Sequence, residues 1–330
     1  PKPNAELVII DEAHCQLGKM AAETLGLYPD AVHIGMTATP ARSDGRGLGE
    51  HYDKMILGPS VAELTEQGHL VPVRYFAPSK ADLDGVKIQA GDYHQGQLGE
   101  RMNDPKLIGD VVENWLRICP DRRTVVFAVN RAHAMALHNE FTAQGVTSDY
   151  IDGNTENDER KAVLQRVRDG ETRVLCSVDV LSYGWNEPSV SCGIIARPTK
   201  SIARYLQAAG RILRTHPGKQ TAILIDHAGV VEELGFLDDA QPWSLDGKEK
   251  IQDRKAGTEK REPKPITCPK CKAEIKPSRK CPECGADLSH QRQKAIEAVE
   301  AELREVRAKE QAKAGTFPDL SNPDLYAQLR

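Results

Sequence analysis

Two adjacent carboxylates, Asp11 and Glu12, directly follow the apolar run at residues 7–10. Two acids at the end of a buried strand are costly unless a cation or a proton transfer makes use of them. In a site that hydrolyses a nucleotide, the first carboxylate holds Mg²⁺ and the second orients and deprotonates the attacking water. The alternative is a strand end whose acids precede a helix and are favoured by the helix dipole. The two carboxylates alone leave both interpretations open.

A second polar strand end follows along the chain. Residues 33–39 read HIGMTAT, so Thr37, Ala38 and Thr39 leave an apolar strand. Hydroxyls at that position can link the carboxylates to neighbouring groups, although a Thr-rich strand end is also ordinary turn chemistry.

The segment SIARYLQAAGRILR at 201–214 places Gln207, Arg211 and Arg214 at positions i, i+4 and i+7. These positions share one face of a helix. Two arginines on one face repel each other unless an anion lies between them, and a triphosphate is the natural candidate. A solvated basic face is the alternative. The surrounding residues are apolar and predict a half-buried helix, which favours the anion site.

A polar loop follows the apolar strand predicted at 173–178. Ser177 lies at the end of that strand, and the loop carries Gly184 and Asn186. A hydroxyl beside backbone amides at a strand end is suited to binding a backbone phosphate of nucleic acid.

Four cysteines, Cys268, Cys271, Cys281 and Cys284, have the spacing C-x₂-C-x₉-C-x₂-C. Each C-P-x-C turn brings two thiolates to one ion, and four sulfurs in tetrahedral array select Zn²⁺ in a closed, structural site. An iron centre and unmetallated thiols are the alternatives. Residues 248–280 also carry twelve Lys and Arg against five Asp and Glu. A DNA-contact surface and a solvated linker explain that excess equally well.

The elements that position these residues alternate along the chain. Strands are predicted at 7–11, 33–39, 73–77, 124–129, 148–152, 173–178, 192–196 and 221–227, and helices at 105–118, 131–144, 157–169 and 201–213. This alternation predicts an α/β fold in which helices cover both faces of parallel sheets.

The pattern also predicts the division into domains. We expect a partial first domain at 1–77, a polar linker at 78–103, a complete second domain at 104–235, a polar linker at 236–263 and the Cys module at 264–288. A charged helix and tail follow at 289–330, where Ile296, Val299, Leu303 and Val306 share one helical face and are expected to pack on their own domain.

Composition sets limits on the class of protein. The chain has 330 residues, 39% of them hydrophobic and 28% charged, and a net charge of −4. This is typical of a globular protein of about two domains. No run of ~18 apolar residues occurs, so we expect no transmembrane helix and no membrane partner. Residues 1–10 lack the features of a signal peptide, and we expect a cytoplasmic protein of a bacterium or a phage-infected cell.

Four segments, which contain residues 11–14, 35–49, 174–201 and 201–214, resemble motifs II, III, V and VI of superfamily 2 helicases, in order and at plausible spacing. TVVFAVNRAHAMAL at 124–137 looks like motif IV. The phrases TPARSDGRGLG and ARPTKSIARYLQAAGRILR, with a Cys₄ module behind them, are more narrowly similar to RadD-like and phage-type DNA helicases. The motor region is also similar to type III restriction translocases.

The resemblance implies two RecA-like motor domains, the first one partial, with a zinc ribbon behind them. It implies an ATP-driven helicase or translocase that uses ATP, Mg²⁺ and Zn²⁺ and acts on nucleic acid, with DNA favoured over RNA. By the same resemblance, Asp11 would bind Mg²⁺, Glu12 would be the catalytic base, and His14 and Gln207 would connect the two motor domains near the γ-phosphate.

The remaining implied roles concern coupling and binding. Residues that would couple hydrolysis to strand movement are Thr37, Ala38 and Thr39. Residues that would contact the nucleotide are Gly184, Asn186, Arg211 and Arg214. Residues that would contact the nucleic-acid backbone are Asn130 and Ser177. Relatives commonly have Thr and Asp where this chain has Ser177 and Asn186, so the hydroxyl is kept and one charge is lost.

One expected motif is missing from the sequence. No G-x-x-x-x-G-K-[ST] phosphate loop occurs in the 330 residues, and GRGLGEHYDK at 45–54 lacks the Lys-Ser/Thr pair. We therefore expect an N-terminally truncated sequence that does not hydrolyse ATP by itself. The alternatives are a motor subunit of a restriction-type complex and a DNA-binding module that does not hydrolyse ATP.

Overall fold

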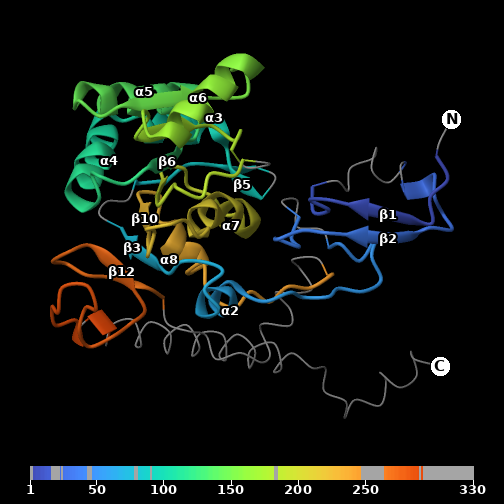
Figure 1. Cartoon of the computed structure of the whole chain (residues 1–330). Helices are drawn as coiled ribbons and strands as arrows, with labels where there is room; N and C mark the ends of the chain where they lie inside the picture. The colour runs from blue at the N-terminus through green and yellow to red at the C-terminus, as the bar shows by residue number, and fades with distance from the viewer. Residues whose placement is uncertain are drawn as a thin grey trace, which may run out of the picture.

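The computed structural model describes residues 3–15, 23, 25–42, 47–77, 81–89, 91–181, 185–246, 264–289 and 291–292. Its two main sheets are a small parallel one and a large mixed one, which lie apart in Figure 1. Gly184, the segment 247–263 and the helical face predicted at 296–306 lie outside the described residues. Within the described ranges, none of the helices combines the length and apolar character needed to cross a bilayer.

The small sheet positions the first two motifs. It pairs β1 (Leu7–Ile10) in parallel with β2 (Val32–Gly35), and Leu7 lies opposite Val32. Beyond the strands, Met36 N donates to Ile10 O and Ala13 N donates to Met36 O. Because parallel strands end at the same edge of a sheet, the turn at 11–15 and the segment at 37–39 meet there.

The large sheet has the strand order β11-β12-β3-β10-β9-β6-β8-β7. Its parallel strands are β3 (Val73–Phe76), β10 (Ala222–Asp226), β9 (Cys192–Ile195), β6 (Thr124–Phe127), β8 (Val174–Ser177) and β7 (Ser148–Ile151). Two short antiparallel strands of the Cys module, β11 (Ile266–Thr267) and β12 (Ala273–Ile275), extend this sheet beside β3.

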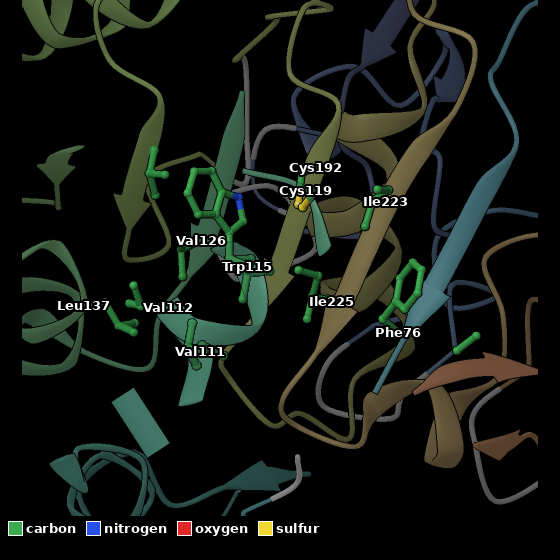
Figure 2. Close-up of a cluster of buried hydrophobic side chains, with 14 of the residues drawn as sticks. Phe76, Val111, Val112, Trp115, Cys119, Val126, Leu137, Cys192, Ile223 and Ile225 are labelled. Carbon is green, nitrogen blue, oxygen red and sulfur yellow. The ribbon is translucent and has the colours of Figure 1, made fainter. Parts of the chain in front are cut away.

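Helices cover both faces of the large sheet. One face packs on α4 (Pro105–Ile118) and α5 (Arg131–Ala143), and Figure 2 shows Trp115 and Leu137 of these helices around Val126 of β6. The other face packs on α6 (Asn157–Asp169), α7 (Ile202–Ala209) and α8 (Val230–Leu234). Successive strand residues alternate between the two cores, since Val125 belongs to the second core and Val126 to the first. The predicted α/β fold is confirmed.

The predicted boundary between the two motor domains needs correction. β3 at 73–76 was assigned to the first domain, but it pairs with β10 and so belongs to the large sheet. Before it lies α2 (Val61–Glu66), whose N-cap Ser60 forms a capping box with Glu63. The sequence identified the strand, but its partner is about 150 positions away and no local pattern indicates it.

The range 78–103 is more structured than the polar linker that was predicted. It contains the hairpin β4 (Ile88–Gln89) and β5 (Asp92–Tyr93), followed by α3 (Gln95–Met102). Leu98 and Met102 of α3 are buried beside Val129. Their burial fixes α3 against the large sheet, although the sequence around them is polar and rich in glycine.

Candidate nucleotide site, nucleic-acid interface and metal centre

The two acids lie in a tight turn directly after β1. Glu12 N donates to Asp11 Oδ1 at 2.9 Å, and Glu12 has φ 48°, in the left-handed region. A non-glycine residue in that region costs free energy and is held there by its surroundings. The turn places the Asp11 carboxylate at the surface and carries the chain inward, so His14 is 8% exposed.

His14 connects the small sheet to α7. Its Nδ1 lies 2.7 Å from Thr37 Oγ1, and its Nε2 lies 2.8 Å from Gln207 Nε2. The same Gln207 nitrogen donates to Thr39 Oγ1 at 3.0 Å, and Thr39 N donates to Thr37 Oγ1 at 3.0 Å. The structure therefore brings together the predicted residues of three motifs in one hydrogen-bonded cluster. Ala38, between the two threonines, is exposed and takes no part in these contacts.

The donors in this cluster determine the protonation of His14. With the Gln207 amide nitrogen turned toward His14, that nitrogen can only donate, so His14 Nε2 is the acceptor and the proton resides on Nδ1. That proton faces Thr37 Oγ1 and, at 3.5 Å, Glu12 Oε2. Burial lowers the pKa of His14, and the Glu12 carboxylate only partly opposes this effect. A neutral His14 is thus the form that fits its partners.

The two arginines follow α7, in the 3₁₀ turn η1 (Gly210–Leu213) and at its end. Arg211 donates to the carbonyl oxygen of Trp185, and Arg214 donates to the same oxygen at 3.0 Å. Arg214 also donates to Asn186 Oδ1 at 2.8 Å. Burial lowers the pKa of Arg214. Asn186 lacks the charge of the Asp that is common at this position in relatives, but its side-chain oxygen still accepts a hydrogen bond from Arg214.

The two predicted nucleic-acid residues have different surroundings. Asn130 is the N-cap of α5, and its side chain accepts from His133 N at 2.9 Å. Ser177, the last residue of β8, is 1% exposed, and its Oγ has no hydrogen-bond partner among the described residues. Ser177 lines a small pocket between the carboxyl ends of β6, β8 and β9 and the start of α7. Gly184 is not among the described residues.

The four cysteines of the module converge on one point. All four Sγ atoms lie within 4.8 Å of one another, and the distances Cys268–Cys284 and Cys271–Cys281 are both 3.7 Å. A tetrahedral ion with metal–sulfur bonds of about 2.3 Å requires sulfur–sulfur distances of about 3.8 Å. Disulfides would require about 2.05 Å. The donor set therefore fits a tetrahedral metal ion.

The two cysteine turns repeat the same backbone pattern. Lys272 N donates to Cys268 O and Gly285 N donates to Cys281 O, both at 2.9 Å. Both Lys272 (φ 62°) and Gly285 (φ 72°) are in the left-handed region. Although burial opposes the effect, backbone amides that donate to Cys268 lower its pKa to about 7, whereas burial raises the pKa of Cys271 to about 12 and that of Cys281 above its usual value.

The Cys module shares the core of the large sheet. The buried residues that it contributes to the core around Phe76 and Trp115 are Ile266, Cys268, Ala273, Ile275, Cys281 and Leu288. Arg74 of β3 forms an ion pair with Glu283, and Lys276 lies 2.7 Å from Asp239. The sequence indicated the metal ligands but gave no sign that their module continues the sheet.

Two further features of the site were missed by the sequence analysis. The acceptor for both arginines is a backbone carbonyl, that of Trp185, and no side-chain pattern indicates it. A cluster of charges, Asp179 with Arg197 and Arg204, also lies at the pocket beside Ser177. The segment ARPTKS contains Arg197, so its charge in an apolar setting was an available signal.

Comparisons with known proteins support the resemblance to superfamily 2 helicases. The family described as "Helicase conserved C-terminal domain" matches residues 109–216. A 51.5 kDa protein of a Lactococcus phage is 30% identical over 310 residues, which are 93% of this chain and 67% of that protein. A Saccharomyces cerevisiae protein named as the ATP-dependent helicase IRC3 is 29% identical over 236 residues, 68% of this chain and 34% of the relative.

A solved structure has a similar fold. It is a fragment described as the HsdR subunit of a type I restriction enzyme from Vibrio vulnificus, with a TM-score of 0.57 and 22% identity, covering 70% of this chain and 46% of the other. The chain thus spans about two thirds of the phage relative and a third of the yeast one. From the ordered motifs, the fold and these relatives, the chain belongs to superfamily 2 of the helicases.

Proposed function

We propose that this chain forms most of the motor of an ATP-dependent DNA helicase or translocase. The observation that carries the proposal is the hydrogen bond between Gln207 and His14, 193 positions apart. It links the turn that holds Asp11 and Glu12 to the helix that precedes Arg211 and Arg214. A motor of this kind uses such a link to connect hydrolysis in one domain with movement of the other.

The residues of the site fit a magnesium nucleotide. Asp11, exposed at the end of β1, would hold Mg²⁺, which neutralises phosphate charge when bound. Glu12 would accept the proton of the attacking water, and His14 keeps its Nδ1 proton toward Glu12 and Thr37. The β- and γ-phosphates need backbone amides and a Lys from a phosphate loop, which the 330 residues do not contain. The proposal therefore concerns a form of the protein that includes one.

The two arginines would bind the nucleotide only after they release the carbonyl oxygen of Trp185. Arg211 and Arg214 both donate to Trp185 O, so a nucleotide phosphate must compete with that carbonyl. A triphosphate carries full negative charge, whereas the carbonyl offers a partial one, so the exchange favours the nucleotide. Release of Trp185 would then free the loop that follows Ser177, beside the proposed nucleic-acid path.

Zinc is the metal that we propose for the Cys₄ site. Four thiolates are a usual ligand set of structural zinc sites, and they fill all four tetrahedral positions, so none is open for water or a substrate. Within the motor, this ion would hold β11 and β12 at the edge of the large sheet.

A single substitution tests the proposed hydrolysis. In a form of the protein that includes a phosphate loop, Glu12→Gln should reduce DNA-stimulated phosphate release by roughly 10²- to 10⁴-fold, the usual contribution of a general base. Glu6→Gln, just before β1, is the matched control and should retain the activity. Equal turnover in Glu12→Gln and the control would contradict the proposed role of this site.

A further inference from the structure

The hairpin of β4 and β5 contacts the loop that leads into α7. Asp92 Oδ2 accepts a hydrogen bond from Thr199 Oγ1 at 2.8 Å, and Asp92 Oδ1 accepts one from Lys200 N at 2.9 Å. The Lys200 ammonium also lies 5.2 Å from the centre of the Tyr93 ring. Two consecutive residues of β5 therefore hold two consecutive residues of a loop that is 107 positions further along the chain, and Figure 1 shows β5 beside α7.

These contacts continue into the first turn of α7. Thr199 Oγ1, which donates to Asp92, accepts a hydrogen bond from Ser201 N at 3.1 Å, and Ser201 is the N-cap of the helix. Arg204, in the first turn, lies 3.8 Å from the Asp92 carboxylate. A negative charge near the amino end of a helix is also favoured by the helix dipole. Asp92 thus fixes the amino end of α7 both by hydrogen bonds and by its charge.

The contact is shielded from water and attached to a packed element. Thr199 is 4% exposed and the Asp92 side chain is 22% exposed. Hydrogen bonds to a charged acceptor are stronger than those between neutral groups, and more so away from water. The hairpin leads directly into α3, and Leu98 of α3 is buried against Val129. Asp92 therefore holds α7 from a part of the molecule that is itself fixed to the large sheet.

The position of α7 decides whether Gln207 reaches the small sheet. Buried side chains such as Tyr205 hold the helix against the large sheet, whereas hydrogen bonds at its ends fix it along its own axis. A shift along that axis by one residue amounts to about 1.5 Å. Such a shift would break the 2.8 Å contact between Gln207 Nε2 and His14 Nε2. The bonds to Asp92 oppose this movement at the amino end.

We propose that Asp92 is a positioning residue of the motor, which sets the place of α7 so that Gln207 reaches His14. Asp92 acts through Thr199 and Lys200 and not by contact with Gln207. The inference rests on the proposed function, because it takes the contact between Gln207 and His14 to connect the two motor domains. The range 78–103 then contributes to the geometry of the site between the domains as well as to the packing of the large sheet.

The first measurement is the ¹⁵N chemical shift of His14 Nε2 in the 330-residue chain. In Asp92→Ala, this shift should rise toward that of Gln207→Ala, because an acceptor nitrogen that loses its hydrogen-bond donor resonates at a higher chemical shift. Asp92→Asn retains an oxygen that can accept from Lys200 N and should restore most of the difference. Asp84→Ala, at an exposed acid before β4, is the matched control and should leave the shift unchanged. Thermal unfolding establishes that each variant is folded.

The second measurement is ATP turnover in a form of the protein that includes a phosphate loop. Asp92→Ala should turn ATP over about 10- to 10²-fold more slowly than the unmodified protein, the effect expected when a residue of the site is misplaced by about 1 Å. Its affinity for ATP should change little. Asp92→Asn should recover most of the turnover, and Asp84→Ala should match the unmodified protein.

The outcomes separate this inference from the proposed function. If His14 Nε2 has the same chemical shift in Asp92→Ala and in Asp84→Ala, or if these two variants turn ATP over equally fast, Asp92 does not position α7 for the motor. The inference is then wrong, and the proposed function stands. If the unmodified protein with a phosphate loop does not hydrolyse ATP in response to DNA, the proposed function fails, and the chemical shift alone decides whether Asp92 positions α7.

Discussion

Gln207 Nε2 lies 2.8 Å from His14 Nε2, across 193 positions of the chain. This contact joins α7 of the large sheet to the turn after β1 of the small sheet, and the two sheets have no strand in common. Together with the bond from Gln207 to Thr39, it links the turn that carries the two carboxylates to the helix that precedes the two arginines.

A negative charge at position 207 should change the pKa or the tautomer of His14. In Gln207→Glu, the new carboxylate would face an unprotonated Nε2, so the pKa of His14 should rise or its proton should move from Nδ1 to Nε2. ¹⁵N NMR of the imidazole during a pH titration distinguishes the two nitrogens. Gln165→Glu, on α6, is the control. Unchanged His14 nitrogens in Gln207→Glu would show that the two residues are not in contact in solution.

The metal prediction concerns both content and stability. Purified protein should contain about one zinc per chain, and Cys281→Ser should lose it, whereas the exposed Cys15→Ser should keep it. Because the module shares the core around Phe76 and Trp115, removal of the metal should also lower the unfolding temperature of the large sheet. Zinc retained in Cys281→Ser would place the ion elsewhere, and an unchanged unfolding temperature would contradict the shared core.

Lys272 and Gly285 occupy equivalent places in the two cysteine turns, and both have positive φ. Lys272→Gly should stabilise the protein by about 0.5–1 kcal/mol, because glycine adopts this conformation without the cost that a side chain incurs, less its larger entropy in the unfolded chain. Urea unfolding measures the change. Gly285→Ala is the reciprocal variant and should destabilise by a similar amount; a loss of stability in Lys272→Gly would show that its side chain has another role.

The fold was largely predictable from the sequence, while much of the site was not. The strand positions and the helices at 105–118 and 157–169 follow from hydrophobic patterning, and Asp104 and Gly170 mark helix ends. The helix predicted at 201–213 ends as an α-helix before Gly210 and continues as a 3₁₀ turn. The strand β3 pairs with β10 of the large sheet instead of belonging to the first domain. Contacts through backbone atoms, such as Trp185 O, and ion pairs between distant segments, such as Asp179 with Arg197, leave no local pattern.

Buried His133 should make stability sensitive to acid. It is 1% exposed, and burial lowers its pKa to about 4. Its contribution is complete above the ordinary pKa of about 6.5 and is lost as the pH falls toward 4, since the unfolded chain binds the proton first. Between pH 7 and pH 5 the free energy of unfolding should fall by about 2 kcal/mol more in the unmodified protein than in His133→Gln.

Urea unfolding at the two pH values measures this difference. His69→Gln, at an exposed histidine, should retain the full acid sensitivity of the unmodified protein. Equal pH dependence in His133→Gln and the unmodified protein would show that His133 is not a buried neutral residue.

Arg211, whose guanidinium donates to Trp185 O in this structure, is the residue on which the proposed motor site depends most strongly. In a form of the protein that includes a phosphate loop, Arg211→Ala should bind ATP with nearly unchanged affinity but turn it over about 10³-fold more slowly, as expected of an arginine finger. Arg117→Ala, on the exposed side of α4, should leave both quantities unchanged. DNA-stimulated phosphate release together with nucleotide binding measures the two effects separately. Unchanged turnover in Arg211→Ala would mean that this helix is a basic packing face and would contradict the proposed motor site.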